Sequence, residues 1–285
     1  MVITPEKEII ELHDGVYARL HTGLTNAGFI IGDQGVLIID SLRVPSFARE
    51  LVEDIRKITK KPIKYVIDTH SHWDHSWGNE EFQYATIIGH DNCYKEMIDL
   101  EWNSKWRTKV TAAEAPWSKE VAAVNITPPN LTFETSMRLY FDGKEIHLWY
   151  FGKAHTSGDI FIHLPKEQIV FTGDVAQARA IPFLEDGYPY EWPETDNRLL
   201  GLKVERFVSG HGSIGTYEEL TEARDFMQAL VDNLKDAKQE GLNAADASKA
   251  TTIALAPQFD EWRGFEGLEV ATPAFYNKLN RSSVI

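Results

Sequence analysis

A cluster of histidine and aspartate side chains after a short apolar segment constrains the fold of this chain more than any other feature. The cluster reads H-x-H-x-D-H and consists of His70, His72, Asp74 and His75. Residues 63–68 before it are largely apolar and rich in β-branched side chains, which predicts a buried strand. The cluster therefore lies in a loop at a strand end, where side chains can converge on one point.

The composition of this cluster predicts a metal site. Three imidazoles and a carboxylate packed so closely are costly to bury without a partner, and a divalent cation removes that cost. Neutral imidazole and carboxylate suit zinc, with iron or manganese as alternatives. The chain has 10 histidines among 285 residues, so three within six positions are far more than chance would place there.

The spacing divides the cluster between two metal ions. His70 and His72 are two positions apart in an extended segment, so their side chains project to the same side and can bind one ion. Asp74 and His75 follow after the chain has begun to turn, and would face a neighbouring ion. The sequence therefore predicts a binuclear site.

Three further residues with metal-binding side chains lie where other predicted strands end. A histidine stands in a glycine-flanked turn after residues 145–151, a carboxylate follows residues 169–173, and a histidine between glycines follows residues 206–209. These residues are His155, Asp174 and His211. Strand ends at one edge of a sheet bring such side chains together, so we expect them to join the first four.

With these motifs in this order, the chain resembles the metallo-β-lactamase superfamily of binuclear metallohydrolases over roughly residues 15–215. The resemblance implies an α/β fold, the four-layer αβ/βα sandwich of that family. It also implies two zinc ions per chain, with iron or manganese as alternatives. The first metal would be held by His70, His72 and His155, the second by Asp74, His75 and His211, and both by a bridging Asp174.

The residue at the bridging position helps to distinguish between branches of the superfamily. True β-lactamases of the superfamily place a different residue there, whereas a carboxylate such as Asp174 resembles the glyoxalase II, lactonase and related hydrolase branches. Hydrolysis of β-lactams is therefore less favoured. Glyoxalase II typically continues its last motif as Gly-His-Glu, and this chain has Gly210-His211-Gly212, which weakens a glutathione-thioester assignment.

The resemblance implies a metal-dependent hydrolase that uses a bridging hydroxide to cleave an ester, lactone, thioester or related bond. Asp74 is the expected catalytic residue, since it can orient the hydroxide and take its proton. The alternative from another class is an oxidoreductase similar to persulfide dioxygenases, which keep a single iron on a subset of the same positions. A binding protein with a decayed site is disfavoured by the complete set of seven residues.

Composition limits the partners. The net charge of −14 argues against nucleic-acid binding, which needs clustered Lys and Arg, so we expect a small-molecule substrate and no nucleic acid. No stretch approaches ~20 consecutive apolar residues, and residues 1–8 lack the pattern of a secretory signal, so no membrane partner is expected. Cys93 is the only cysteine, which fits a cytoplasmic location. Homo-oligomers are compatible with this composition.

The expected domain organisation has a catalytic domain over residues 1–240 and a C-terminal extension over residues 241–285 packed on the core. Residues 91–130 are too long for an ordinary connection between strands. They are interpreted as an inserted lid whose tryptophans wall the pocket, with an elaborated outer layer as the alternative. The aromatic residues of the C-terminal extension are expected to pack on the core. Two alternatives stay open, that they line the substrate site or form a subunit contact.

Two helices are predicted, over residues 46–60 and 217–238, from apolar side chains at helical spacing. Strands are predicted over residues 16–21, 27–32, 35–40, 63–68, 84–88, 137–142, 145–151, 160–164, 168–172 and 205–209. The histidines outside the motifs are not expected to bind metal; they are His13, His21, His90, His147 and His163. Asp159 is interpreted either as an acceptor that fixes a ligand imidazole or as a turn-forming residue.

Overall fold

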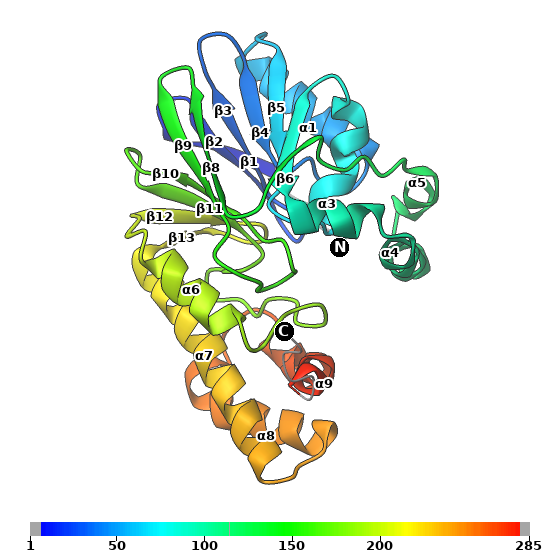
Figure 1. Cartoon of the computed structure of the whole chain (residues 1–285), viewed down its shortest axis with the longest axis vertical. Coiled ribbons are helices and arrows are strands. Elements are labelled where there is room, and N and C mark those ends of the chain that lie inside the picture. Colours follow the sequence, from blue (N-terminus) through cyan, green and yellow to red (C-terminus); the bar gives the residue numbers. More distant parts are fainter. Residues whose placement is uncertain (1–6, 114, 280–285) are drawn as a thin grey trace.

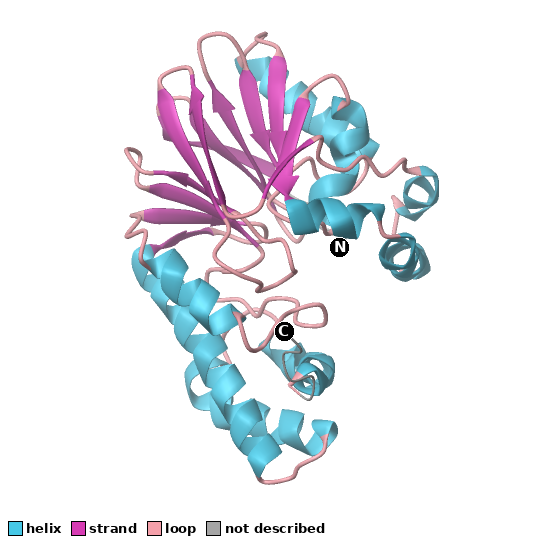
Figure 2. Ribbon diagram, viewed as in Figure 1, coloured by secondary structure: helices cyan, strands magenta, loops and turns pink. Residues whose placement is uncertain are grey.

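Two β-sheets packed face to face form the centre of the molecule, with helices on both outer faces (Figures 1 and 2). The computed structural model describes residues 7–113 and 115–279. This arrangement is the predicted α/β four-layer sandwich. Residues 1–6, most of the segment expected not to be a signal, lie outside the described part, as do residues 280–285 of the expected extension.

The first sheet has seven strands whose spatial order follows the sequence. They are β1 (Lys7–His13), β2 (Val16–His21), β3 (Ala27–Ile31), β4 (Val36–Ile39), β5 (Ile63–Ile67), β6 (Thr86–His90) and β7 (Leu131–Phe133). Strands β1 to β4 pair antiparallel, as the predicted meander requires, and β4 to β7 pair parallel. The edge strands β1 and β7 were not predicted, because β1 has no clear alternation of apolar residues and β7 is only 3 residues long.

The second sheet has six strands in the order β13-β12-β11-β10-β9-β8. They are β8 (Ser136–Phe141), β9 (Lys144–Trp149), β10 (Phe161–Leu164), β11 (Ile169–Gly173), β12 (Arg206–Ser209) and β13 (Ile214–Thr216). Only the pair β11 and β12 is parallel. All but the short edge strand β13 were predicted.

Apolar side chains fill the space between the sheets. Ile30, Ile67 and Ile88 of the first sheet pack in one cluster with Ile162 and Phe171 of the second. Successive side chains of a strand point to opposite faces, so each strand also supplies an outward apolar face that needs a cover. Helices provide that cover on both sides.

Helix α1 (Pro45–Ile58) covers the outer face of the first sheet. Its buried face is formed by Ala48, Leu51 and Ile55, which lie at helical spacing. Proline at the first helical position suits the start of the helix, because its missing N–H is not needed there. The predicted helix over residues 46–60 is therefore confirmed to within two residues at each end.

Helices α6 (Trp192–Leu200) and α7 (Tyr217–Gln239) cover the outer face of the second sheet (Figure 1). A capping box starts α7, in which the Thr216 side chain accepts from the backbone of Glu219 and the Glu219 carboxylate accepts from the backbone of Thr216. The predicted helix over residues 217–238 is thus confirmed.

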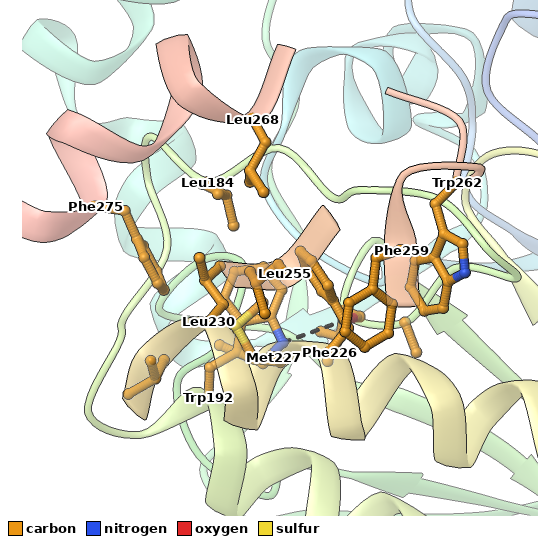
Figure 3. Close-up of a cluster of buried hydrophobic side chains, with 14 of the residues drawn as sticks. Leu184, Trp192, Phe226, Met227, Leu230, Leu255, Phe259, Trp262, Leu268 and Phe275 are labelled. Carbon is orange, nitrogen blue, oxygen red and sulfur yellow. Dashed lines mark hydrogen bonds between the residues drawn. The ribbon is translucent and has the colours of Figure 1, made fainter. Parts of the chain in front are cut away.

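The C-terminal residues fold into α8 (Ala244–Phe259), a 3₁₀ turn (Phe265–Gly267) and α9 (Leu268–Lys278). Their aromatic side chains pack on α7: Phe226 lies 5.2 Å from Phe259 and 5.4 Å from Trp262 between ring centroids (Figure 3). Neither helix was predicted, because Pro257 and Pro273 lie inside them and both bury apolar residues without one clear stripe. Within the described residues, no helix has both the length and the apolar composition that a membrane span requires.

The long connection between β6 and β7 is helical. It contains α3 (Asp91–Ile98), α4 (Leu100–Ala112) and α5 (Ser118–Ala123), and α4 and α5 stand out from the sandwich beyond the edge of the first sheet (Figure 1). Trp106 and Val110 of α4 and Val121 of α5 are buried in a small apolar cluster that also contains Val44 and Trp77. That residues 91–130 act as a lid stays a prediction.

Candidate metal centre

The structure brings all seven predicted residues together, from both sheets. Five positions lie in loops after strands: two histidines after β5, one between β9 and β10, an aspartate after β11 and a histidine after β12. The other two lie in the short helix α2 (Trp73–Ser76), which begins where the sequence predicted a turn. The seven residues are His70, His72, Asp74, His75, His155, Asp174 and His211.

The first group consists of His70, His72 and His155, all buried. Their ligand atoms lie within 4.8 Å of one another, and Nδ1 of His72 is 2.8 Å from Nε2 of His155. Burial lowers the pKa of His70 well below its usual value and that of His155 to about 3, and the neighbouring imidazoles add to both shifts. These two imidazoles are therefore neutral at pH 7, the form that binds metal.

The second group consists of Asp74, His75 and His211. Nε2 of His211 lies 3.2 Å from Oδ2 of Asp74, and Nε2 of His75 lies 3.8 Å from the same oxygen. Burial lowers the pKa of both imidazoles, but nearby carboxylates, chiefly Asp174, raise it more: well above its usual value for His75 and to about 9 for His211. This group is ion-paired, whereas His70 and His155 of the first group are neutral.

Asp174 lies between the two groups. Its Oδ1 is 3.3 Å from Nε2 of His75, and its Oδ2 is 3.4 Å from Nε2 of His211 and 3.7 Å from Nε2 of His155. Burial raises the pKa of Asp174, but His211 and His75 lower it more, to well below its usual value. Gly210 makes room for this carboxylate, since a Cβ there would lie 2.1 Å from Oδ1.

Several buried polar atoms at this point have no hydrogen-bond partner among the described residues. They are Nε2 of His70, Nε2 of His75 and Oδ1 of Asp174. A buried polar atom without a partner is costly, and three at one point fit the binding of cations. Imidazole nitrogen and carboxylate oxygen are donors that suit zinc, iron or manganese.

Hydrogen-bond acceptors behind the imidazoles fix the orientation of four of the five candidate ligand rings. Nδ1 of His75 lies 2.8 Å from Asp40 Oδ2, and Nε2 of His72 lies 3.2 Å from Asp186 Oδ2. Backbone carbonyls serve the other two rings: Nδ1 of His155 lies 3.0 Å from the Phe183 oxygen, and Nδ1 of His211 lies 3.0 Å from the Leu24 oxygen. Each contact turns the opposite nitrogen towards the centre.

The sequence analysis missed these acceptors. Asp40 directly follows β4 and also accepts from the backbone and hydroxyl of Thr69, at 2.7 and 2.8 Å. It therefore lies at a strand end like the predicted ligands, which is the signal that could have revealed it. Asp186 lies in the irregular segment between β11 and α6, where no pattern marks it.

Asp159 does not contact a ligand imidazole. Its carboxylate accepts from the backbone and the hydroxyl of Thr156, both at 2.8 Å, and so closes the turn that carries His155. Burial raises its pKa to about 7. Of the two interpretations, the turn-forming one agrees with the structure.

Helix α4 contacts the first group. The Trp102 ring lies parallel to the His72 ring at 5.9 Å, and the Trp106 ring meets it edge-on at 4.9 Å. Nζ of Lys105 lies 2.9 Å from Oδ1 of Asp186, the residue whose other oxygen contacts His72. The inserted segment is therefore in contact with a predicted metal ligand.

Comparison with known proteins agrees with this geometry. The model of a family described as the Metallo-beta-lactamase superfamily matches residues 22–211, a range that includes all seven candidate ligands. The chain belongs to the metallo-β-lactamase superfamily, as its motifs predicted.

Two curated relatives show how widely the functions of similar proteins differ. The chain is 25% identical over 245 residues to the 2,4-dinitroanisole O-demethylase subunit alpha of Nocardioides sp. (strain JS1661), covering 84% of this chain and 66% of that protein, just under two thirds. It is 25% identical over 232 residues to the Metallo-beta-lactamase type 2 of Bacillus sp. (strain 170), covering 77% of this chain and 82% of that protein.

Solved structures of the same fold are also similar. A metallo-beta-lactamase from Pontibacter korlensis has a TM-score of 0.63 and 19% identity, covering 78% of this chain and 99% of that one. The DIM-1 metallo-beta-lactamase has a TM-score of 0.62 and 18% identity, covering 79% and 98%. At such low identity the likeness shows the shared fold.

Proposed function

We propose that the protein is a binuclear zinc hydrolase that cleaves an ester, lactone, thioester or related bond in a small, partly apolar molecule. The observation that supports this most directly is the pair of ligand groups with Asp174 within 4 Å of members of both. A single-metal enzyme would need only one group.

Two zinc ions bound by these residues would polarise a carbonyl oxygen and lower the pKa of a water from ~15.7 to near ~7. The protein supplies orientation and proton transfer. The pKa of Asp74 lies well below its usual value, since the neighbouring His75 and His211 outweigh its burial, so it is ionised at neutral pH. Its half-buried carboxylate is placed to orient the attacking water and to accept its proton.

The surroundings of the first group suggest where the substrate lies. Trp102, Trp106 and Phe183 surround the His72 ring, each within 6.0 Å between ring centroids. Such walls favour an aromatic or apolar group beside the bond that is cleaved. Similarity to a subunit of a 2,4-dinitroanisole O-demethylase adds an activated aryl ether to the bonds worth testing.

Metal analysis followed by a substrate screen tests the proposal. The purified protein should contain two zinc ions per chain and hydrolyse chromogenic esters or lactones, or demethylate 2,4-dinitroanisole, with little turnover of β-lactams. A single iron with oxygen consumption on a persulfide would support the dioxygenase alternative instead. Fast turnover of β-lactams would overturn the subtype inferred from Asp174.

A further inference from the structure

Arg43 is a buried cation beside the second ligand group. The residue is only 4% exposed. The guanidinium carbon lies 4.7 Å from the ring centroid of Trp117, 5.2 Å from that of Phe47 and 5.3 Å from that of Trp73, all within cation–π range. Trp117 comes from the inserted segment, next to α5, so this segment helps to hold the arginine in place.

The guanidinium is connected to a predicted metal ligand through one hydroxyl. Nη2 of Arg43 donates to Oγ1 of Thr25 at 3.1 Å, and Oγ1 of Thr25 donates to Oδ2 of Asp74 at 2.7 Å. Arginine can only donate hydrogen bonds, so the Thr25 oxygen accepts from Arg43 and its own proton must point elsewhere. The carboxylate of Asp74 receives it, at the short distance of a hydrogen bond to a charged acceptor.

The backbone of Thr25 is fixed against another ligand of the same group. Thr25 and His211 form an isolated antiparallel bridge, and the N–H of Asn26 donates to the Gly210 carbonyl at 2.7 Å. Asp74 belongs to the first sheet's side of the centre and His211 to the second sheet's side. Thr25 therefore contacts both ligands, one through its side chain and one through its backbone.

We propose that Arg43 and Thr25 form a positioning relay that holds Asp74 in register with His211 at the second metal position. The inference rests on the proposed binuclear function, and names two residues that act through Asp74 without touching the metal themselves. Arg43 orients the Thr25 hydroxyl, and the hydroxyl orients the carboxylate. The oxygen that receives this hydrogen bond, Oδ2 of Asp74, is also the one that faces Nε2 of His211 and Nε2 of His75.

Zinc titration of the metal-free full-length protein, in competition with a chromogenic chelator, tests the relay. Thr25→Val keeps the shape and removes the hydroxyl, so the dissociation constant of the second zinc should rise by about 10–100-fold, the usual effect of losing such a contact. The first zinc should bind as before. Thr25→Ser restores the hydroxyl and should restore the second affinity, and thermal melting of each metal-free variant checks folding.

A double-mutant cycle then tests whether Arg43 acts through Thr25. Arg43→Met removes a positive charge in either background, so the purely electrostatic change is common to both. Arg43→Met should raise the dissociation constant of the second zinc by a clearly larger factor in the wild type than in Thr25→Val. Additive effects, or wild-type binding of the second zinc by Thr25→Val, would overturn the relay while leaving the hydrolase proposal intact. A wild-type protein that binds one zinc would overturn both.

Discussion

The two ligand groups differ in charge before any metal binds. His70 and His155 of the first group are buried imidazoles whose pKa values are lowered, chiefly by burial. His75 and His211 of the second group face the carboxylates of Asp74 and Asp174, which raise their pKa values. The second group is also the more open one, with the His211 side chain 25% exposed.

This difference in charge predicts how strongly each position binds a metal ion and whether binding displaces protons. In the first group a cation displaces no proton from His70 or His155, because both imidazoles are already neutral. In the second group the protons on His75 and His211 already balance the carboxylates, and a cation must replace them. We therefore expect the second position to bind metal more weakly than the first, and its affinity to depend more strongly on pH.

The largest expected effect is that of pH on the second metal. With a pKa of about 9 for His211 and a raised pKa for His75, both imidazoles hold a proton at pH 7 in the metal-free protein. The apparent affinity should therefore rise with pH by up to about tenfold per unit for each proton displaced, or ~100-fold per unit for both. The first affinity should change much less, because the pKa of His155 is already about 3. Zinc titrations at pH 6, 7 and 8 measure both, and equal slopes would contradict this difference.

Removing the proposed bridging carboxylate should weaken the second metal by roughly 10³-fold, since Asp174→Ala would leave two bound cations without the negative charge that they are proposed to share. The stoichiometry should fall from two equivalents towards one, with the first group still binding. Metal analysis after dialysis, alongside activity, checks this. Two tightly bound ions and full activity in the variant would show that Asp174 is not a ligand, and the subtype argument against β-lactamases would fail with it.

Replacing the proposed base should reduce turnover without emptying the site. Asp74→Asn keeps an oxygen that can bind metal but cannot accept a proton, so kcat should fall by ~10² or more. Steady-state kinetics on a chromogenic substrate, with metal content measured on the same sample, separates the two roles. Near-normal kcat with both metals bound would refute proton transfer by Asp74.

The smallest effects should come from the residues behind the ligands, and they should differ between the groups. Asp40→Asn alters the partner of His75 and should weaken the second metal by about tenfold, while Asp186→Asn alters the partner of His72 and should weaken the first by a similar factor. Each variant is the control for the other in the same titration. If both weakened the same metal, the division into two groups would be wrong.

The sequence predicted that these seven residues would come together, because each follows a strand that is readable on its own. His70 to His75 stand together after one buried strand, and His155, Asp174 and His211 follow other strands, with glycines adjoining Asp174 and His211 and flanking the turn that carries His155. The acceptors Asp186 and Phe183 could not be predicted, since they lie in irregular backbone whose position depends on tertiary packing. The relay through Arg43 could not be predicted from the sequence either, because the three aromatic rings that surround the guanidinium come from separate segments of the chain.

The same contrast holds for the fold. Central strands and the helices α1 and α7 carry periodic apolar patterns and were found, whereas the short edge strand β7 and the proline-containing helices α8 and α9 were not. In these helices apolar residues contact α7 and each other on more than one side, so no single stripe appears. Tertiary packing decides their structure more than local propensity does.

The convergence of ligands from both sheets has a consequence for how the chain assembles. Neither ligand group is complete until the loops of the first sheet meet those of the second, so a bound ion would stabilise only the folded state. At a free metal concentration 1,000 times the dissociation constant, that stabilisation is about 4 kcal/mol. Under metal starvation the chain would therefore unfold more often and become open to proteolysis, and the supply of metal would set how long each molecule survives.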